Sequence, residues 1–157
     1  MAIPARASRP GTYFVTSCTF SRTRIFQKTA NAELFIATLQ HYRSEGRYKL
    51  HAFVVMPDHI HLILTPTAIT LERAVGLIKG GFSQRLGSQL PVSQRGFTDH
   101  RIRDQADMET RRSYLHMNPV RAGLIQGPEL YLFSSAYRLA ADPSGYGRSL
   151  PSSEWHD

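Results

Sequence analysis

The chain of 157 residues is 41% hydrophobic and 20% charged, with one cysteine and a net charge of +7. Its length predicts a single domain with its own core, and the lone cysteine excludes an internal disulfide and is typical of a reducing cytoplasm. No stretch approaches the roughly 18 unbroken apolar residues of a membrane span, so we expect a cytoplasmic protein without a membrane partner. The positive charge favours a polyanionic partner.

The first part of the chain carries a strand pattern and then a helix pattern. Residues 1–10 contain two prolines and two arginines without periodicity, which indicates a basic N-terminal arm. The stretch 12–20 is rich in strand-forming residues and predicts the first strand, in which we expect Cys18 to be a core residue. Apolar residues at three- and four-residue spacing predict a helix over 31–44 that ends at Gly46.

A hairpin and a second helix follow. The runs 48–56 and 59–65 predict two strands joined by a tight turn at Pro57-Asp58, hence an antiparallel pair. Thr70 is a candidate N-cap for a helix that runs to about residue 86. Within this helix, Gly80-Gly81 costs roughly 1 kcal/mol per glycine relative to alanine, and such a pair indicates a kink or a close backbone approach.

The last part of the chain predicts one more strand and one more helix. After a polar loop over 87–95, residues 96–102 predict a short strand. Residues 104–117 predict a third helix, whose acidic first turn suits the helix dipole. From residue 128 onward the pattern is mostly irregular, and 133–137 is expected to dock on the core.

The predicted order of elements, β-α-β-β-α-β-α, indicates an α+β, ferredoxin-like fold. A four-stranded antiparallel sheet would carry helices on one face, with an additional C-terminal helix. In this topology the third strand lies inside the sheet. We expect one domain over 11–140, between the arm at 1–10 and a flexible tail at 141–157.

Two histidines stand two residues apart in the third predicted strand. Because side chains alternate along a strand, His59 and His61 lie on the same face. The opposite face carries apolar residues that can bury against a helix: Ile60, Leu62 and Leu64. A neutral imidazole is the commonest biological metal ligand, so the pair can chelate one divalent ion. The alternative is a strand that happens to carry two structural or surface histidines.

Tyr114 and Asn118 are four residues apart in the third predicted helix and therefore share a face. This helix could present Tyr114 near the histidine pair and offer the Asn118 amide oxygen as a third ligand of a Mg²⁺ or Mn²⁺ ion. Such an ion polarises a phosphodiester oxygen, and a tyrosine beside it is a feasible nucleophile. The alternatives are a tyrosine ring in the core with its hydroxyl at the surface, and an asparagine that caps a new helix beginning at Pro119.

Three motifs follow one another along the chain. They are Met-Pro-Asp-His-Ile-His-Leu at 56–62, Gly-Phe-Thr-Asp-His-Arg-Ile-Arg at 96–103 and Tyr-Leu-His-Met-Asn-Pro-Val-Arg-Ala-Gly-Leu at 114–124. Together they resemble the IS200-like transposases, and most closely the REP-associated tyrosine transposase branch. The Phe-Ser-Ser-Ala-Tyr segment at 133–137 is similar to an aromatic-Ser-Ser segment of that branch. The resemblance covers roughly residues 10–138.

The resemblance implies a single-tyrosine HUH nuclease that cleaves single-stranded DNA, often beside a hairpin or repeat element, and transfers the strand through a 5′-phosphotyrosine. In that scheme His59 and His61 bind the metal, Tyr114 is the nucleophile and Asn118 stands at the third ligand position. IS200-like relatives form dimers with shared sites, whereas the REP-associated branch can complete its site within one chain, so monomer and homodimer both stay open. A catalytically inactive regulator that binds DNA hairpins is the alternative function.

Arginine carries nearly all of the positive charge, because only three of the 19 basic residues are lysines. The guanidinium group pairs bidentately with phosphate and stacks on bases, which favours a nucleic-acid partner over a compositional bias. Five basic residues are candidates for contact with DNA: Lys79, Arg85, Arg101, Arg103 and Arg121. Each can equally be a solvated surface charge. For Asp99 and His100, beside these arginines, a structural hydrogen bond is favoured over an acid-base role.

Overall fold

The computed structural model describes residues 10–87 and 96–141. Its strands are β1 (Tyr13–Cys18), β2 (Tyr48–Met56), β3 (His59–Pro66) and β4 (Thr98–Arg101). Its helices are α1 (Thr29–Ser44), α2 (Leu71–Leu86), α3 (Gln105–Arg121) and α4 (Ser135–Ala141), with 3₁₀ turns η2 (Phe20–Arg22), η3 (Ile25–Gln27) and η4 (Pro128–Leu130). The predicted order of elements is confirmed, and α4 adds a short helix to the segment predicted to be irregular.

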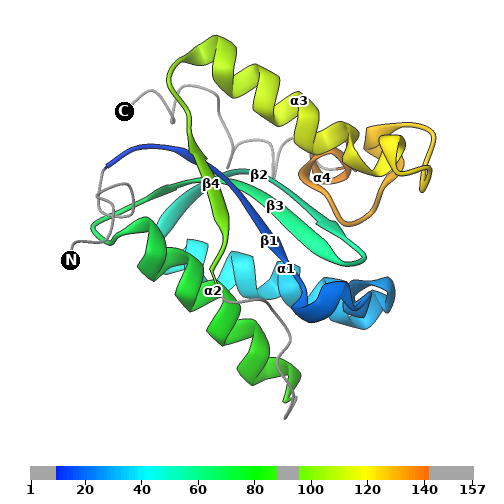
Figure 1. The fold of residues 1–157 in the computed structure, drawn as a ribbon, viewed down its shortest axis with the longest axis horizontal. Coiled ribbons are helices and arrows are strands. Elements are labelled where there is room, and N and C mark those ends of the chain that lie inside the picture. Colours follow the sequence, from blue (N-terminus) through cyan, green and yellow to red (C-terminus); the bar gives the residue numbers. More distant parts are fainter. Residues whose placement is uncertain (1–9, 88–95, 142–157) are drawn as a thin grey trace.

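The four strands form one antiparallel sheet in the order β2-β3-β1-β4. As predicted, β3 lies inside the sheet, between β2 and β1. Figure 1 shows α1 and α2 on one side of this sheet and α3 and α4 on the other. The structure therefore confirms the predicted α+β fold, with a layer of two helices on one face and the additional C-terminal helix α3 on the opposite face.

Two clusters of buried side chains hold the helices to the sheet. The larger cluster packs α1 and α2 against alternate residues of β3: Ile60, Leu62 and Leu64. The smaller cluster lies under α3, where Met108 and Leu115 are fully buried near Ile63. Burying one such side chain contributes about 1.5–3 kcal/mol, so Met108 and Leu115 fix α3 to the sheet face that also carries His59 and His61.

One prediction and one alternative at the ends of elements are wrong. Cys18 is half-buried rather than a core residue, because β1 ends there and the chain turns into η2, where Phe20 is 48% exposed. Helix α3 continues past residue 117 through Asn118 and Pro119 to Arg121, so Asn118 does not cap a new helix. An interior proline typically costs a helix about 3 kcal/mol; Pro119 stands in the last turns of α3 and is buried.

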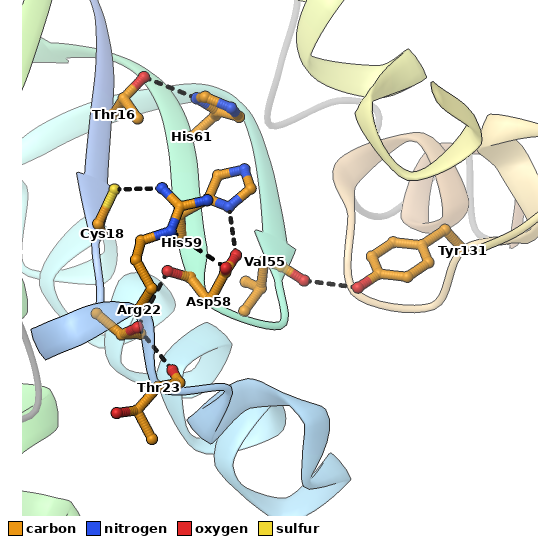
Figure 2. Close-up of polar contacts among 10 residues, drawn as sticks. Thr16, Cys18, Arg22, Thr23, Val55, Asp58, His59, His61 and Tyr131 are labelled. Atoms are coloured by element: carbon orange, nitrogen blue, oxygen red, sulfur yellow. Dashed lines mark hydrogen bonds and ion pairs between the residues drawn. The ribbon is translucent and has the colours of Figure 1, made fainter. Parts of the chain in front are cut away.

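The segment after η4 docks along the outer edge of β2. Val55 N–H donates to the Phe133 carbonyl at 2.8 Å, and Phe53 N–H donates to Ser135 Oγ at 3.0 Å. The Tyr131 hydroxyl donates to the Val55 carbonyl at 2.8 Å (Figure 2). The docking predicted for 133–137 is therefore confirmed, and it supplies hydrogen-bond partners to an edge strand.

The close approach predicted at Gly80-Gly81 is confirmed at the second glycine. A Cβ on Gly81 would lie 2.6 Å from Tyr42 Oη and 2.9 Å from Arg85 Nη1, whereas a Cβ on Gly80 would meet nothing within 4 Å. Gly81 therefore allows α1 and α2 to pack closely where Tyr42 crosses α2.

Several predicted segments lie outside the described residues. They are the basic arm before Pro10, the greater part of the predicted loop at 87–95, and the tail from residue 142. Among the helices that the structure does describe, none is long and apolar enough to cross a membrane.

Candidate functional site

His59 and His61 lie side by side on the α3 face of β3, with ring centroids 4.9 Å apart and planes at 77°. Each ring is held at Nδ1. The Nδ1 of His59 is 2.8 Å from Asp58 Oδ1, and the Nδ1 of His61 is 2.8 Å from Thr16 Oγ1 (Figure 2). With Nδ1 engaged in both rings, Nε2 is the nitrogen left to bind a metal ion. An ionised carboxylate can only accept, so Nδ1 of His59 is the donor to Asp58, and in the neutral ring the lone pair is on Nε2.

The surroundings of His61 keep its ring neutral. Burial lowers the pKa of His61 to about 3, and its electrostatic interactions with His59 and Arg121 act in the same direction. Metal binding requires the neutral form of imidazole, so a histidine that does not take up a proton near neutral pH is ready to act as a ligand. The neighbour Phe14 stacks on the ring at 5.2 Å between centroids and further restricts its orientation.

Tyr114 lies over the same face of the sheet. Its side chain is 47% exposed, and its ring stands edge-on to those of His61 and Phe14, with centroids 5.9 Å and 6.1 Å away. The guanidinium of Arg121 lies 4.1 Å above the Tyr114 ring, and its Nη2 donates to the Tyr114 carbonyl at 2.6 Å. The alternative of a tyrosine ring in the core is therefore wrong, because the ring packs at the rim of the histidine pair.

Asn118 is one helical turn beyond Tyr114, in the interior of α3 and half-buried. It therefore shares a face of the helix with Tyr114, as its spacing predicts. Within the described ranges, no group of three His, Cys, Asp or Glu side chains could hold a metal ion. An amide oxygen is a further ligand type that Mg²⁺ and related divalent ions accept, so Asn118 stays the predicted third ligand.

The candidate DNA contacts fall into two groups. Arg121 lies at the site itself, and Arg101 and Arg103 lie at the end of β4 and just after it, ahead of α3. Arg101 donates twice to the Pro10 carbonyl, at 2.8 and 3.2 Å, while the side chain of Arg103 is 75% exposed and 3.5 Å from Asp107. Arg101 is the strand partner of Tyr13, whose ring packs on the α1 and α2 side of the sheet, so only Arg121 is shown beside Tyr114. Contact of the three arginines with DNA stays a prediction.

Lys79 and Arg85 belong to α2, in the helix layer on the opposite side of the sheet (Figure 1). Lys79 Nζ donates to the Gly96 carbonyl at 2.8 Å, and Arg85 Nη1 donates to the Gly81 carbonyl at 3.1 Å. The structure therefore does not bring these two residues to the face that carries His59, and their role in DNA binding also stays a prediction.

The hydrogen bond favoured for His100 is confirmed. Its Nε2 is 2.8 Å from Asp107 Oδ2, and Asp107 also accepts from the Arg103 N–H at 2.9 Å. Asp107 thereby joins β4 to the first turn of α3, the helix that carries Tyr114. This contact gives His100 a structural role.

Two neighbours of the histidines were not recognised as site residues from the sequence. Thr16 comes to His61 only through the pairing of β1 with β3, in which the two residues are partners. That register cannot be read before the strand order is known. Asp58 could have been found, because a carboxylate directly before a candidate metal-binding histidine is a common orienting partner.

The chain is similar to known proteins in sequence. The family model described as "Transposase IS200 like" matches residues 10–102, a range that includes His59 and His61 and ends before Tyr114. A protein of Haemophilus influenzae described as a REP-associated tyrosine transposase is 26% identical, over 83% of this chain and 82% of its own length.

Two solved structures share the fold. The first is a REP-associated tyrosine transposase bound to a REP hairpin, with a TM-score of 0.77, 23% identity, and coverage of 100% of this chain and 92% of that one. The second is a protein of Deinococcus radiodurans described as a transposase, with a TM-score of 0.52, 17% identity, and coverage of 73% of this chain and 95% of that one. The first match extends over the whole chain and so includes α3.

Proposed function

The chain belongs to the IS200-like transposase family, a family of DNA transposition, and we propose from this membership that it cuts and rejoins single-stranded DNA through Tyr114. The observation that carries the proposal is the position of the Tyr114 ring 5.9 Å from that of His61 in the same chain. A potential nucleophile and a pair of potential metal ligands therefore meet without help from a second copy.

In the proposed first step, the Tyr114 hydroxyl attacks the phosphorus of a phosphodiester in line with the 3′ oxygen. The tyrosine gives up its proton, the bond from phosphorus to the 3′ oxygen breaks, and that oxygen leaves as a 3′ hydroxyl. The 5′ phosphate is then esterified to Tyr114. In the second step the 3′ hydroxyl of another strand attacks the phosphotyrosine, forms a new phosphodiester and releases the tyrosine.

The residues around the histidines fit a divalent ion, Mg²⁺ or Mn²⁺. His59 and His61 would hold it through Nε2, with the Asn118 amide oxygen as the third ligand, and Asp58 and Thr16 would orient the rings through the contacts at Nδ1. When bound, such an ion polarises a phosphate oxygen and stabilises the charge that develops in the transition state.

Arg121 would hold the proposed nucleophile, Tyr114, by packing on the face of its ring. A guanidinium 4.1 Å above the ring of Tyr114 attracts the face of the ring and restricts its orientation. Its hydrogen bond to the Tyr114 carbonyl ties the cation to the turn of α3 that carries the nucleophile. We infer that Arg121 both orients the ring and attracts the scissile phosphate.

The DNA that we propose as the partner carries a hairpin beside the cleavage site, because the structural neighbour that spans this chain is bound to a REP hairpin. The net charge of +7 supports a polyanionic partner. Arg121 would contact phosphates at the site, and the exposed Arg103 would contact them ahead of α3.

The test is the formation of a covalent adduct. A 5′-labelled and a 3′-labelled library of single strands, each with a hairpin flanked by random sequence, is incubated with the protein and Mn²⁺ and resolved on a denaturing gel. Wild-type protein should form an adduct with the 3′-labelled fragment, whose new 5′ phosphate is esterified to Tyr114. Tyr114→Phe removes only a hydroxyl, so it should fold and bind hairpins while losing both adduct and cleavage.

Tyr137→Phe is the matched control, because it removes a hydroxyl from α4 and should leave the adduct intact. Cleavage by Tyr114→Phe at the wild-type rate would mean that water is the nucleophile. Hairpin binding by the wild-type protein without any cleavage would instead support the inactive regulator.

A further inference from the structure

Arg22 joins the end of β1 to the turn that precedes β3. Its Nη1 donates to Cys18 Sγ at 2.9 Å, and its Nε donates to Asp58 Oδ2 at 3.2 Å (Figure 2). The other oxygen of the same carboxylate is 2.8 Å from Nδ1 of His59. Asp58 therefore lies between a fixed cation and one of the two site histidines, with one oxygen for each.

The backbone that presents Arg22 adopts a strained conformation. Ser21 and Arg22 have φ angles of 54° and 57°, in the left-handed region that side chains other than glycine rarely adopt. In the described ranges only one other residue besides glycine has a positive φ, Ala68. Two adjacent residues persist in this region only where the surroundings hold them there, and such positions cluster at functional sites.

Thr19 provides much of that hold. Its N–H donates to the Asp58 carbonyl at 3.0 Å, and its hydroxyl lies 2.6 Å from the Thr23 carbonyl and 3.1 Å from that of Asp58. The Arg22 N–H donates to the Thr19 carbonyl at 3.1 Å. The same turn thus holds Asp58 twice, through its backbone and through its carboxylate.

The contribution of this ion pair to folding does not explain the strained turn. The side chain of Arg22 is 55% exposed, and that of Asp58 is 25% exposed. Exposed pairs of this kind contribute little to stability. The arrangement instead fixes an orientation. With Oδ2 of Asp58 held by the guanidinium of Arg22, Oδ1 is left to contact His59.

We propose that Arg22 is a positioning residue for His59. By fixing the Asp58 carboxylate, Arg22 keeps the imidazole proton on Nδ1 and turns the Nε2 lone pair toward the space beside His61. The metal-related part of this inference rests on the proposed function, whereas the effect on the His59 ring does not require a metal. Loss of a partner that orients a ligating histidine typically lowers metal affinity about 10–100-fold.

The test compares two glycine substitutions in adjacent residues of the turn. Arg22→Gly removes the guanidinium and relieves the positive φ at the same time. Ser21→Gly relieves a positive φ next to it and keeps the guanidinium, so it is the matched control. For each protein, long-range ¹H–¹⁵N spectra at pH 8 without metal report the His59 tautomer, titration calorimetry reports the Mn²⁺ affinity, and a melting curve reports stability.

We expect the wild-type protein and Ser21→Gly to show a single Nδ1-protonated tautomer at His59 and equal Mn²⁺ affinity. Arg22→Gly should show a mixture of tautomers and bind Mn²⁺ about tenfold more weakly, the lower end of the range for orienting partners, with a melting temperature no lower than that of the wild type. A purely structural role would lower the melting temperature and leave the tautomer of the folded protein unchanged. If Arg22→Gly does not fold, Arg22→Lys takes its place, because one ammonium cannot reproduce the fork that contacts both Cys18 and Asp58.

An unchanged tautomer and Mn²⁺ affinity in the arginine variant would overturn the inference. Weaker binding of single-stranded DNA with an unchanged tautomer would show instead that Arg22 is a phosphate contact. A wild-type protein that binds no Mn²⁺ would contradict the proposed metal site, while the tautomer comparison would still decide the role of Arg22.

Discussion

The ring of Tyr114 stands edge-on to that of His61, with centroids 5.9 Å apart and planes inclined by 71°. The two residues come from α3 and β3, which meet because Leu115, next to the tyrosine in the chain, is fully buried against the sheet. The direction of Tyr114 is thus set by the packing of its neighbour. The proposed nucleophile is held by a rigid element rather than by a loop, which favours a fixed attack geometry.

Replacing His61 by Ala should remove metal binding together with DNA cleavage. A ligand that binds only the folded state raises stability, by about 2.7 kcal/mol at a concentration of 100 times Kd. Mn²⁺ should therefore raise the melting temperature of the wild-type protein and leave that of His61→Ala unchanged. His100→Ala is the control, because His100 bonds to Asp107 away from the pair, and its melting temperature should still rise with Mn²⁺. A normal cleavage rate in His61→Ala would rule out the ligand role.

Binding to single-stranded DNA should weaken steeply as salt rises. Each phosphate contact contributes about 0.7 to the slope of log K against log salt for a single strand. Arg121→Gln and Arg103→Gln should each lower that slope by about this amount, as measured by fluorescence anisotropy. Arg47→Gln is the control, since Arg47 pairs with Glu45 after α1. A flat salt dependence in the wild type would mean that the +7 charge is a compositional feature, and an effect of Lys79→Gln would show that α2 also contacts DNA.

The buried His51 should make the fold sensitive to acid. Burial, and then the positive charges of Lys49 and Arg112, lower the pKa of His51 to about 4, whereas in the unfolded chain it has its ordinary value of about 6.5. Between these values the unfolded state binds a proton that the folded state does not, so the free energy of unfolding falls as the pH falls. The loss from this residue reaches about 3 kcal/mol at pH 4 and is absent above pH 6.5.

Urea denaturation at pH 4.5, 5.5 and 7 measures this effect, with His51→Gln as the comparison. Glutamine can still bond to Thr65, which accepts or donates a hydrogen bond at 2.8 Å in the native protein. The variant should lose less stability than the wild type between pH 7 and 4.5. Parallel curves for the two proteins would contradict the burial argument.

The two adjacent glycines of α2 should respond in opposite directions to alanine. Gly80→Ala places a methyl group in open space and should stabilise the helix by up to about 1 kcal/mol. Gly81→Ala would bring its methyl group within 2.6 Å of Tyr42 Oη, so the Tyr42 ring and Arg85 must shift from their packed positions and the protein should be destabilised. Melting temperatures of the two variants decide the matter, and an equal gain in both would show that Tyr42 has room to move.

Much of the fold follows from patterns within short stretches of sequence. The alternation along β3 correctly separated the histidines from Ile60, Leu62 and Leu64, and the spacing of Tyr114 and Asn118 correctly placed them on one helix face. Cys18 was misjudged because the strand pattern continues to residue 20, whereas the chain leaves the sheet at Cys18 for the strained turn of η2. No local pattern predicts that turn, because several of the contacts that hold it come from Asp58, which is 36 residues beyond Arg22 in the chain.

The site itself was only partly accessible from sequence. His59, His61 and Tyr114 carry chemistry that their types and spacing reveal. Two groups orient these residues. Thr16 reaches His61 through the register of β1 and β3. The side chain of Arg121 runs back along α3 to the ring of Tyr114. Such relationships depend on three-dimensional packing and become visible only when the elements are assembled.

The edges of the sheet also bear on how the molecule behaves at high concentration. The outer side of β2 is occupied by the segment around Phe133 and Ser135, and the outer strand β4 has only four residues, Thr98–Arg101. Long rows of unpaired backbone groups are what allow sheets of separate molecules to join and aggregate. Over the described part of the chain, one edge is partly paired already and the other is short, so both edges limit the joining of sheets from separate molecules.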